Sequence, residues 1–466
     1  MTDRDQGPTP TVSRVLPDGR LVELLYDPDR RATALAVGGP DGEVAVHDTL
    51  DLVDGERLVP YGADNNLIAT GCVLLPSEVG VFTTQSALIG EIQAFLHRYV
   101  DLSPVFADIA AHYVLLSWVY DAFSELPYLR LRGDYGTGKT RALIAIGSLC
   151  YKPFFASGAS TVSPIFHVLD AFGGTLVLDE ADFRFSDATA PLSKILNNGN
   201  MAGLPVLRTM TNRHKELNPR AFRVYGPKLV AMRHSFADRA LESRFLTEET
   251  GQRPLRSDIP IQLPAELHTE ARALRNSLLA WRLANRATVR TDASRQAAGV
   301  EPRLNQTALS LLSLMEDPEL RVRVHAGMAR EQARLSDERA ASPEGRMVQV
   351  LVDLFADPSR GRVAVSAVAE AFNRTGDDPG RAPASARWVG WCLRERLKLT
   401  AVKSNGVFVL PASECAKVEA LAVRYGVRRP TAAPAAPTPR ESPPPPAPVS
   451  PDHGLPSTAR TPAGES

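Results

Sequence analysis

The sequence predicts an α/β protein built around a mostly parallel sheet with helices on both faces. From about residue 126 to 250, short apolar runs that suit buried strands alternate with segments of helical periodicity, a rhythm typical of parallel sheets. Within this stretch, a glycine-rich loop joins one expected strand to a helix, and another apolar run ends in two adjacent carboxylates. At 466 residues the chain is long enough for several domains.

The composition is that of an ordinary globular protein, with 44% hydrophobic and 23% charged residues and a formal net charge of zero. Any contact with nucleic acid must therefore come from local basic patches. The polar N-terminus and the lack of an apolar run of about 18 residues predict no signal peptide and no membrane span. The four cysteines form no CxxC pair, which argues against a zinc site or a disulfide framework and favours a cytoplasmic location.

Residues 1–82 read as short strands separated by turns. The dipeptides Asp18-Gly19 and Asp41-Gly42 each separate two β-prone runs, which is a hairpin signal. We therefore expect a small β-rich N-terminal domain.

Residues 83–125 are expected to form a helical lead-in. Helical spacing begins at Ser86, and Ser103-Pro104 suits an N-cap followed by proline at the first position of a second helix.

Residues 126–250 are expected to form the core. The strands are predicted at 128–132, 153–156, 175–179 and 228–232, and the helices at 139–150 and 163–172.

The strongest motif follows the first of these strands and opens the next helix. It has the pattern Gly-x4-Gly-Lys-Thr of a phosphate-binding loop, or P-loop, and comprises Gly133, Asp134, Tyr135, Gly136, Thr137, Gly138, Lys139 and Thr140. Its glycines let backbone N–H groups surround phosphate oxygens at a helix N-terminus. Lys139 is expected to reach the β- and γ-phosphates, and the Thr140 hydroxyl is expected to ligate Mg²⁺. The motif thus predicts a P-loop NTPase that binds ATP with Mg²⁺.

The second motif is the apolar run 175–178 followed by Asp179 and Glu180. Ligands of open α/β sheets bind where the strands end. We expect Asp179 to hold the Mg²⁺ shell and Glu180 to act as the base that polarises the attacking water. The alternative is an exposed acidic loop without a catalytic role.

Phosphoryl transfer also gains from an arginine at the developing negative charge, often supplied by a neighbouring subunit. Arg244 is the first candidate and Arg239 the second. The alternative is an arginine paired with Asp238 or Glu242 on a helix surface.

The C-terminal half is expected to be mainly helical. Residues 251–343 suit a helical lid, and residues 344–411 read as three helices and a β-hairpin, the order of a winged helix. Arg387, Arg394 and Lys403 could contact DNA there, unless the unit docks a protein instead. Residues 412–466 suit a short helix followed by a disordered tail rich in proline.

In the order of its motifs the chain resembles the AAA+-type ATPases of phages and plasmids, and among these the superfamily 3 helicases. The features that carry the resemblance are the P-loop, the Asp179-Glu180 strand, the phrase 225–228 entering a fourth strand, and the arginines after it. The resemblance covers roughly residues 86–335. It implies a homo-oligomeric ring, action on single- or double-stranded DNA, and a role in replication of a mobile element, where a separate primase could be a partner.

The resemblance also gives meaning to the segment before the fourth strand. Residues 206–209 and 221–224 could pair as a hairpin whose tip carries Arg213, His214 and Lys215, residue types that suit phosphate contacts in a central pore. A solvated surface loop is the alternative. The chain departs from the family where Arg233-His234 ends the fourth strand, since a polar residue, often asparagine, is usual there.

Two functions follow from these motifs. The first is an ATP-hydrolysing, helicase-like motor on DNA. The second is an ATP-dependent oligomeric switch whose winged helix binds duplex DNA or a protein partner.

Overall fold

The computed structural model describes residues 7–39, 42–157, 160–179, 190–211, 217–236, 238–356, 361–375 and 383–427. The chain divides into two compact units, residues 1–334 and 335–466. No helix in the described ranges is both long and apolar enough to cross a membrane.

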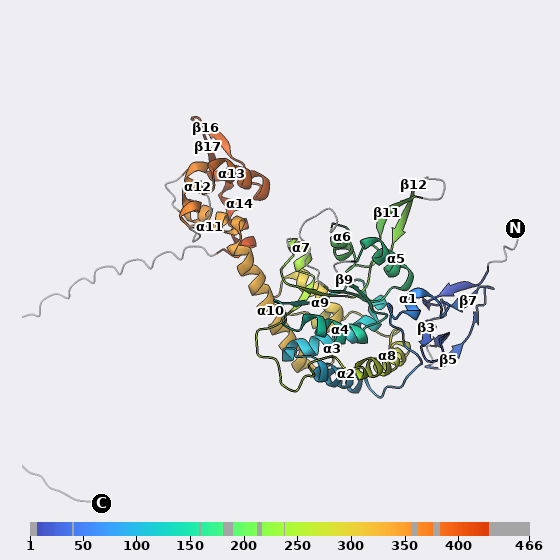
Figure 1. The fold of residues 1–466 in the computed structure, drawn as a ribbon. Coiled ribbons are helices and arrows are strands. Elements are labelled where there is room, and N and C mark those ends of the chain that lie inside the picture. Colours follow the sequence, from blue (N-terminus) through green and yellow to red (C-terminus); the bar gives the residue numbers. More distant parts are fainter. Residues whose placement is uncertain are drawn as a thin grey trace, which may run out of the picture. The chain divides into compact units, whose positions relative to one another are not determined.

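The centre of the first unit is a five-stranded sheet in which every neighbouring pair is parallel (Figure 1). Its strands, in spatial order, are β14 (Phe245–Glu249), β8 (Tyr128–Arg132), β13 (Lys228–Met232), β10 (Leu176–Asp179) and β9 (Phe154–Ser157). The predicted parallel sheet is confirmed. Strand β14 was not foreseen, because its last three residues are Thr-Glu-Glu and the apolar signal is short.

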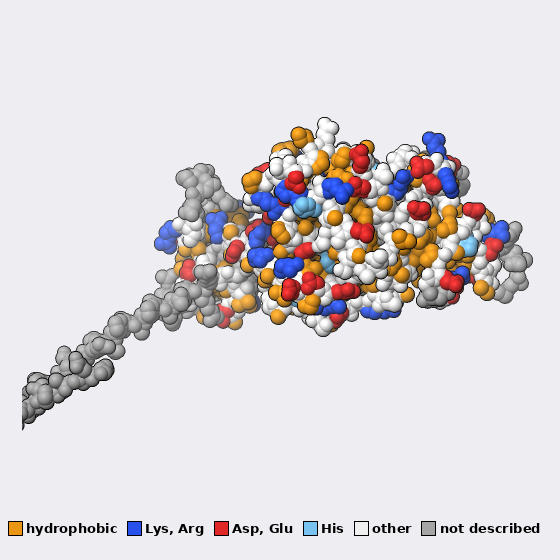
Figure 2. Space-filling view, turned by 90° about the horizontal axis from the view of Figure 1, so that it is seen from below, with side chains coloured by type: hydrophobic (Ala, Val, Ile, Leu, Met, Phe, Trp, Pro, Cys, Tyr) orange, Lys and Arg blue, Asp and Glu red, His pale blue; other side chains and the backbone are white. Residues whose placement is uncertain are grey.

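Helices cover both faces of this sheet (Figure 1). One face carries α2 (Gln85–Tyr99), α3 (Pro104–Trp118), α4 (Lys139–Leu149) and α8 (Glu266–Asn285). The other face carries α5 (Val162–Phe172) and α6 (Ala190–Asn198). Figure 2 shows the molecule from the side of α2 and α8, where acidic and basic side chains are interspersed with hydrophobic ones.

The segment expected to be a lid is helical but belongs largely to the helix layer beside the sheet. Helix α8 packs against α2, α3 and α4, and its Trp281 is fully buried. It is followed by α9 (Pro302–Leu312) and α10 (Pro318–Ala341). The buried side chains of α8 pack in the same hydrophobic cluster as the lead-in helices. The apolar stripe that suggested a lid is therefore used to complete the core.

Helix α3 begins at Pro104 as the sequence predicts, with Ser103 at the N-cap position. The Ser103 side chain makes no capping bond to its own helix. Its hydroxyl instead donates to the Glu248 carboxylate at 2.6 Å, which ties the helix to β14.

The N-terminal segment forms two small sheets. One has the order β2-β3-β4-β5 and the other β1-β7-β6. Their bounds are β1 (Thr9–Thr11), β2 (Ser13–Val15), β3 (Leu21–Asp27), β4 (Ala32–Gly38), β5 (Val44–His47), β6 (Leu50–Asp51) and β7 (Arg57–Pro60), followed by helix α1 (Asn66–Ala69). Leu21, Leu25 and Ala36 are part of the hydrophobic cluster that contains α2, α3 and α8. The segment therefore shares the core of the first unit, and it does not form a compact unit of its own.

The second unit contains three helices followed by a hairpin, in the order that the sequence predicts. Its elements are α11 (Pro343–Phe355), β15 (Arg362–Ala364), α12 (Val365–Arg374), α13 (Ala386–Trp391), β16 (Val402–Ser404), β17 (Val407–Pro411) and α14 (Cys415–Tyr425). Ser385 caps α13, since the Trp388 N–H donates to its hydroxyl at 3.2 Å. Asn405 and Gly406 both have positive φ, as a two-residue hairpin turn requires. The predicted proline-rich tail lies outside the described residues.

Candidate nucleotide-binding site

The P-loop lies between β8 and α4, at the carboxyl end of the parallel sheet. Gly136 and Gly138 have φ of 72° and 85°, a backbone conformation that residues with a Cβ rarely adopt. Gly138 is the N-cap of α4, so the helix begins at Lys139 with its first N–H groups directed at the loop. The motif therefore has the strand–loop–helix setting that phosphate binding requires.

The ammonium group of Lys139 lies against the loop itself. It donates to the carbonyl oxygens of Gly133, at 2.7 Å, and Asp134, at 2.5 Å. These bonds hold the positive charge against the loop that is expected to bind phosphate.

Thr140, near the start of α4, meets Asp179, the last residue of β10. The Thr140 hydroxyl donates to the Asp179 carboxylate at 2.9 Å. Strand β13 lies between β8 and β10 in the sheet, so the contact crosses one strand. Hydroxyl and carboxylate oxygens are the ligands that Mg²⁺ prefers, and the pair fits the predicted metal site. Glu180, the predicted base, lies outside the described residues.

A pocket of about 330 Å³ surrounds the loop. It is lined by P-loop residues, Asp179 and the end of β13, including Arg233. The Arg233 guanidinium stacks on the Tyr135 ring at 3.6 Å from its centroid. Arg233 thus lines the pocket, whereas the next residue, His234, is exposed and is not among the lining residues.

The far side of the P-loop is braced by Thr250, a contact that sequence reasoning missed. Its hydroxyl lies 2.8 Å from the Thr137 hydroxyl and 3.0 Å from the Arg132 carbonyl. A Cβ on Gly133 would come within 2.4 Å of that hydroxyl. Recognition of strand β14 would have revealed this contact, because β14 pairs with β8 and places Thr250 beside the loop.

The candidate arginine Arg244 is half-buried next to α7 (Arg239–Glu242) and is not among the residues that line the phosphate pocket. It donates to the side chain of Asn197, whose amide group donates to Asp238 at 3.0 Å. Burial, followed by the nearby charge of Arg303, lowers the pKa of Arg244. The side chain of Arg239 lies outside the described residues.

Glu242 does not pair with Arg244. It forms a bidentate bond with the buried Arg130 of β8, at 2.6 and 2.8 Å. This ion pair attaches the segment that carries the candidate arginines to the central sheet.

The predicted hairpin exists. Strands β11 (Val206–Thr211) and β12 (Leu217–Phe222) are antiparallel and project from the core (Figure 1). The tip, with Arg213, His214 and Lys215, lies outside the described residues. The base is basic as well, because Arg208 stacks on Phe166 at 4.7 Å and Arg220 is paired with Asp170.

In the second unit, Arg387, Arg394 and Lys403 are all exposed. The hairpin β16–β17 also exposes apolar side chains, among them Val407 and Phe408, the latter with 49% of its surface accessible.

No protein-family model and no curated protein matches the chain. Among solved structures, the NrS-1 C-terminal region is 10% identical, with a TM-score of 0.38, over 84% of this chain and 96% of that one. The SCCmec type IV Cch active helicase is 11% identical, with a TM-score of 0.34, over 89% and 82%. The JCV helicase is 14% identical, with a TM-score of 0.24, over 54% and 61%.

At these low values the similarities decide neither fold nor function. The motif, its strand–loop–helix setting and the five-stranded parallel sheet themselves give the core the fold of a P-loop NTPase.

Proposed function

We propose that this protein binds and hydrolyses ATP in the P-loop pocket and uses the energy as a helicase-like motor on DNA. The observation that carries the ATPase part is the contact between Thr140 and Asp179 beside Lys139. It joins the two motifs that the sequence could identify only separately.

Each of these residues has a distinct task in the proposed reaction. The P-loop N–H groups and Lys139 bind and orient the phosphates, and Thr140 and Asp179 would hold Mg²⁺. When bound, the metal neutralises charge on the phosphate oxygens. Glu180 follows Asp179 directly in the chain, and we assign it the role of the general base that accepts a proton from the attacking water. Arg233, at the pocket wall, is the candidate that senses the terminal phosphate.

The first experiment is steady-state ATP hydrolysis by the wild type and Lys139→Ala, each with and without single-stranded DNA. Lys417→Ala, which removes an exposed lysine of the second unit, is the control. We expect hydrolysis that depends on Lys139 and rises several-fold with DNA. If hydrolysis depends on Lys139 but does not change with DNA, the proposed ATPase activity stands and the proposed motor function on DNA is contradicted.

We propose that Arg244 acts on the ATP of a neighbouring subunit in a homo-oligomeric ring. Arg244 is not among the residues that line the P-loop pocket of its own subunit, and it lies on an anchored segment; both observations support this assignment. Mixing inactive Lys139→Ala subunits with inactive Arg244→Ala subunits should restore activity, because some interfaces then combine an intact Lys139 with an intact Arg244. If the mixture stays inactive while both variants assemble, the assignment is wrong.

We further propose that the second unit is a winged helix that contacts DNA through Arg387, Arg394 and Lys403. The exposed Val407 and Phe408 on its hairpin favour the alternative, a switch that docks a protein. Replacing Arg394 and Lys403 with glutamine should weaken duplex binding, whereas Phe408→Ser should not. The reverse pattern, with loss of self-association or of a bound partner, would support the switch.

A further inference from the structure

A second cavity in the first unit lies at the opposite end of the sheet from the P-loop. Its volume is about 860 Å³, within the range typical of small-ligand sites. It is lined by residues that come shortly before the strands, among them Phe123 before β8, Tyr151 before β9 and Tyr225 before β13. The P-loop pocket lies where the same strands end, so the two sites are separate.

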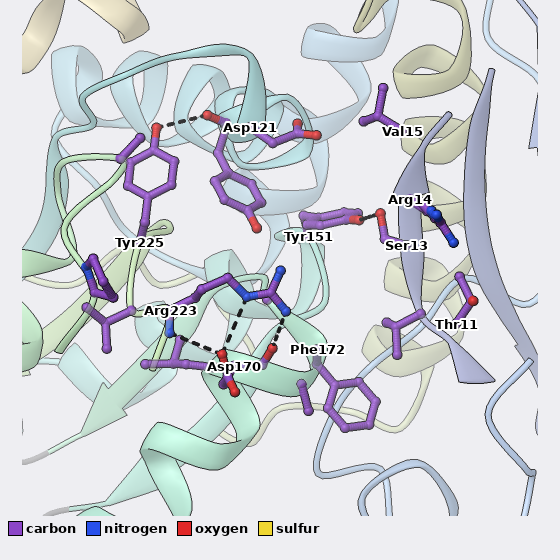
Figure 3. Close-up of a pocket in the computed structure, with 18 of the residues that line it drawn as sticks. Thr11, Ser13, Arg14, Val15, Asp121, Tyr151, Asp170, Phe172, Arg223 and Tyr225 are labelled. Carbon is purple, nitrogen blue, oxygen red and sulfur yellow. Dashed lines mark hydrogen bonds and ion pairs between the residues drawn. The ribbon is translucent and has the colours of Figure 1, made fainter. Parts of the chain in front are cut away.

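The walls of this cavity are rich in aromatic rings. The six that line it are Tyr61, Tyr120, Phe123, Tyr151, Phe172 and Tyr225. Tyr120 contacts both Tyr151 and Tyr225, with ring centroids 5.9 and 5.6 Å apart. Figure 3 shows Tyr225 and Tyr151 on one side of the space and Phe172 on the other. Tyr61 packs on Phe172 with ring centroids 5.6 Å apart, so aromatic rings stand on two sides of the space.

Charge on the walls is unevenly distributed. Four arginines and two aspartates line the cavity, an excess of two positive charges. Arg282 is buried and forms ion pairs with Glu23 and Asp121, and Arg14 forms an ion pair with Glu56. Arg220 and Arg223 share the single carboxylate of Asp170, which is 15% exposed, while their own side chains are 53% and 80% exposed. These two guanidinium groups therefore present donors to solvent at the cavity mouth.

Both of these arginines belong to the base of the projecting hairpin. Arg220 is in β12, and Arg223 directly follows the strand. Burial opposes ionisation of Asp170, but hydrogen bonds from Arg223 and Arg220 outweigh it and lower the pKa. The carboxylate thus stays charged and holds the two arginines beside the aromatic walls, as Figure 3 shows for Arg223.

We propose that this cavity binds a nucleotide unit, with the base between the aromatic walls and the phosphate at Arg220 and Arg223. A planar ring joined to an anion matches both features at once. The nucleotide could be part of a single strand that follows the hairpin to its base, or it could be free. Of these two ligands, only the single-stranded nucleic acid rests on the proposed action on DNA.

The test is fluorescence anisotropy of a labelled oligo(dT) with the full chain, without ATP, as salt is raised. Arg223→Gln should weaken binding several-fold and reduce the slope of log Kd against log salt by about one. Arg30→Gln is the matched control, because Arg30 is 85% exposed and also paired with an aspartate, but lies outside the cavity. It should leave both quantities unchanged.

A second pair of variants tests the aromatic walls. Tyr61→Leu removes a ring and keeps apolar bulk, and should weaken binding about fivefold or more. Tyr61→Phe keeps the ring and should bind like the wild type. Direct calorimetric titration of Lys139→Ala with thymidine monophosphate, in which the P-loop does not contribute, reports whether a free nucleotide also enters.

Each other outcome overturns the proposal in a recognisable way. If oligo(dT) binds but neither variant matters, the strand binds elsewhere and the proposed motor survives. If only Arg223→Gln matters, the cavity mouth is a simple anion site. If neither oligo(dT) nor thymidine monophosphate binds, the cavity proposal fails, while Lys139-dependent hydrolysis still decides the ATPase separately.

Discussion

The two ends of one parallel sheet are built in different ways. At the carboxyl end, the seven consecutive residues 135–141 and one aspartate form most of the P-loop pocket, and much of its lining is backbone. At the amino end, the large cavity draws side chains from segments as distant as Ser13, Tyr151 and Arg282. The first site depends on local sequence, and the second depends on how the whole unit packs.

The two ends also differ in how they handle charge. Beneath the amino-end cavity, Glu23 is almost fully buried between Lys152, at 2.9 Å, and Arg282, at 2.8 Å. Burial opposes the charge of Glu23, but Lys152 and Arg282 outweigh it and lower the pKa. These contacts connect β3 to the core and to α8. The buried network at the amino end stabilises the unit, whereas the residues to which we assign catalysis lie at the carboxyl end.

The largest expected effect tests the amino end. Glu23→Gln leaves Lys152 and Arg282 buried without their shared carboxylate, so the free energy of unfolding should fall by about 3–5 kcal/mol. Urea unfolding followed by tryptophan fluorescence measures this. Asp51→Asn, which breaks an exposed ion pair with Arg57, should change little. Equal effects of the two substitutions would contradict a stabilising role for the buried network.

The next effect tests the carboxyl end. Asp179→Asn keeps an oxygen that can accept from Thr140 but removes the negative charge, so ATP hydrolysis should fall by about a hundredfold. Urea unfolding should be nearly unchanged. The exposed Asp353→Asn serves as the activity control. A large loss of stability with Asp179→Asn would mean that both ends of the sheet are structural.

The third prediction concerns the amino end and the pH dependence of the free energy of unfolding. Lys228 is fully buried at the amino end of β13, and burial lowers its pKa to about 7 from 10.5. Between these values the unfolded chain binds more protons than the folded one, so the unfolding free energy should rise with pH. From about pH 7 to pH 9 we expect a gain of about 1 kcal/mol or more. Lys228→Met should be less stable than the wild type, and its unfolding free energy should depend less on pH over this interval. If the pH dependence is unchanged, groups other than Lys228 cause the rise.

The smallest expected effect concerns the stacked pair at the phosphate pocket. Tyr135→Leu removes the ring under Arg233, a contact worth about 0.5–1 kcal/mol when exposed, so the KM for ATP should rise about two- to fivefold. Tyr135→Phe keeps the ring and should behave like the wild type. If Phe and Leu give the same KM, Arg233 is not positioned by the stacking.

Much of the core could be predicted from the sequence. The starts and ends of β8, α4 and β13 lie at or within one residue of their predicted positions, because glycine, proline and buried apolar runs act locally. The order of the C-terminal elements was found in the same way. Strand β14 was missed, because its pairing with β8 comes from outside its own sequence.

The functional residues follow the same division. The P-loop and Asp179 are identified by consecutive residues whose chemistry is visible without a fold. Two other contacts join residues far apart in the chain. Asn197 accepts a hydrogen bond from Arg244, and Glu242 pairs with Arg130. The sequence left those pairings open, since charge alone allowed several partners.

By itself, the sequence determined a P-loop, the acidic strand end and the alternation of strands and helices, because each depends on backbone preferences over a few residues. Only the tertiary structure decided that α8 joins the core, that the N-terminal strands share it, and that aromatic rings and arginines meet around a second cavity. These features depend on contacts between residues distant in sequence, which no local pattern encodes.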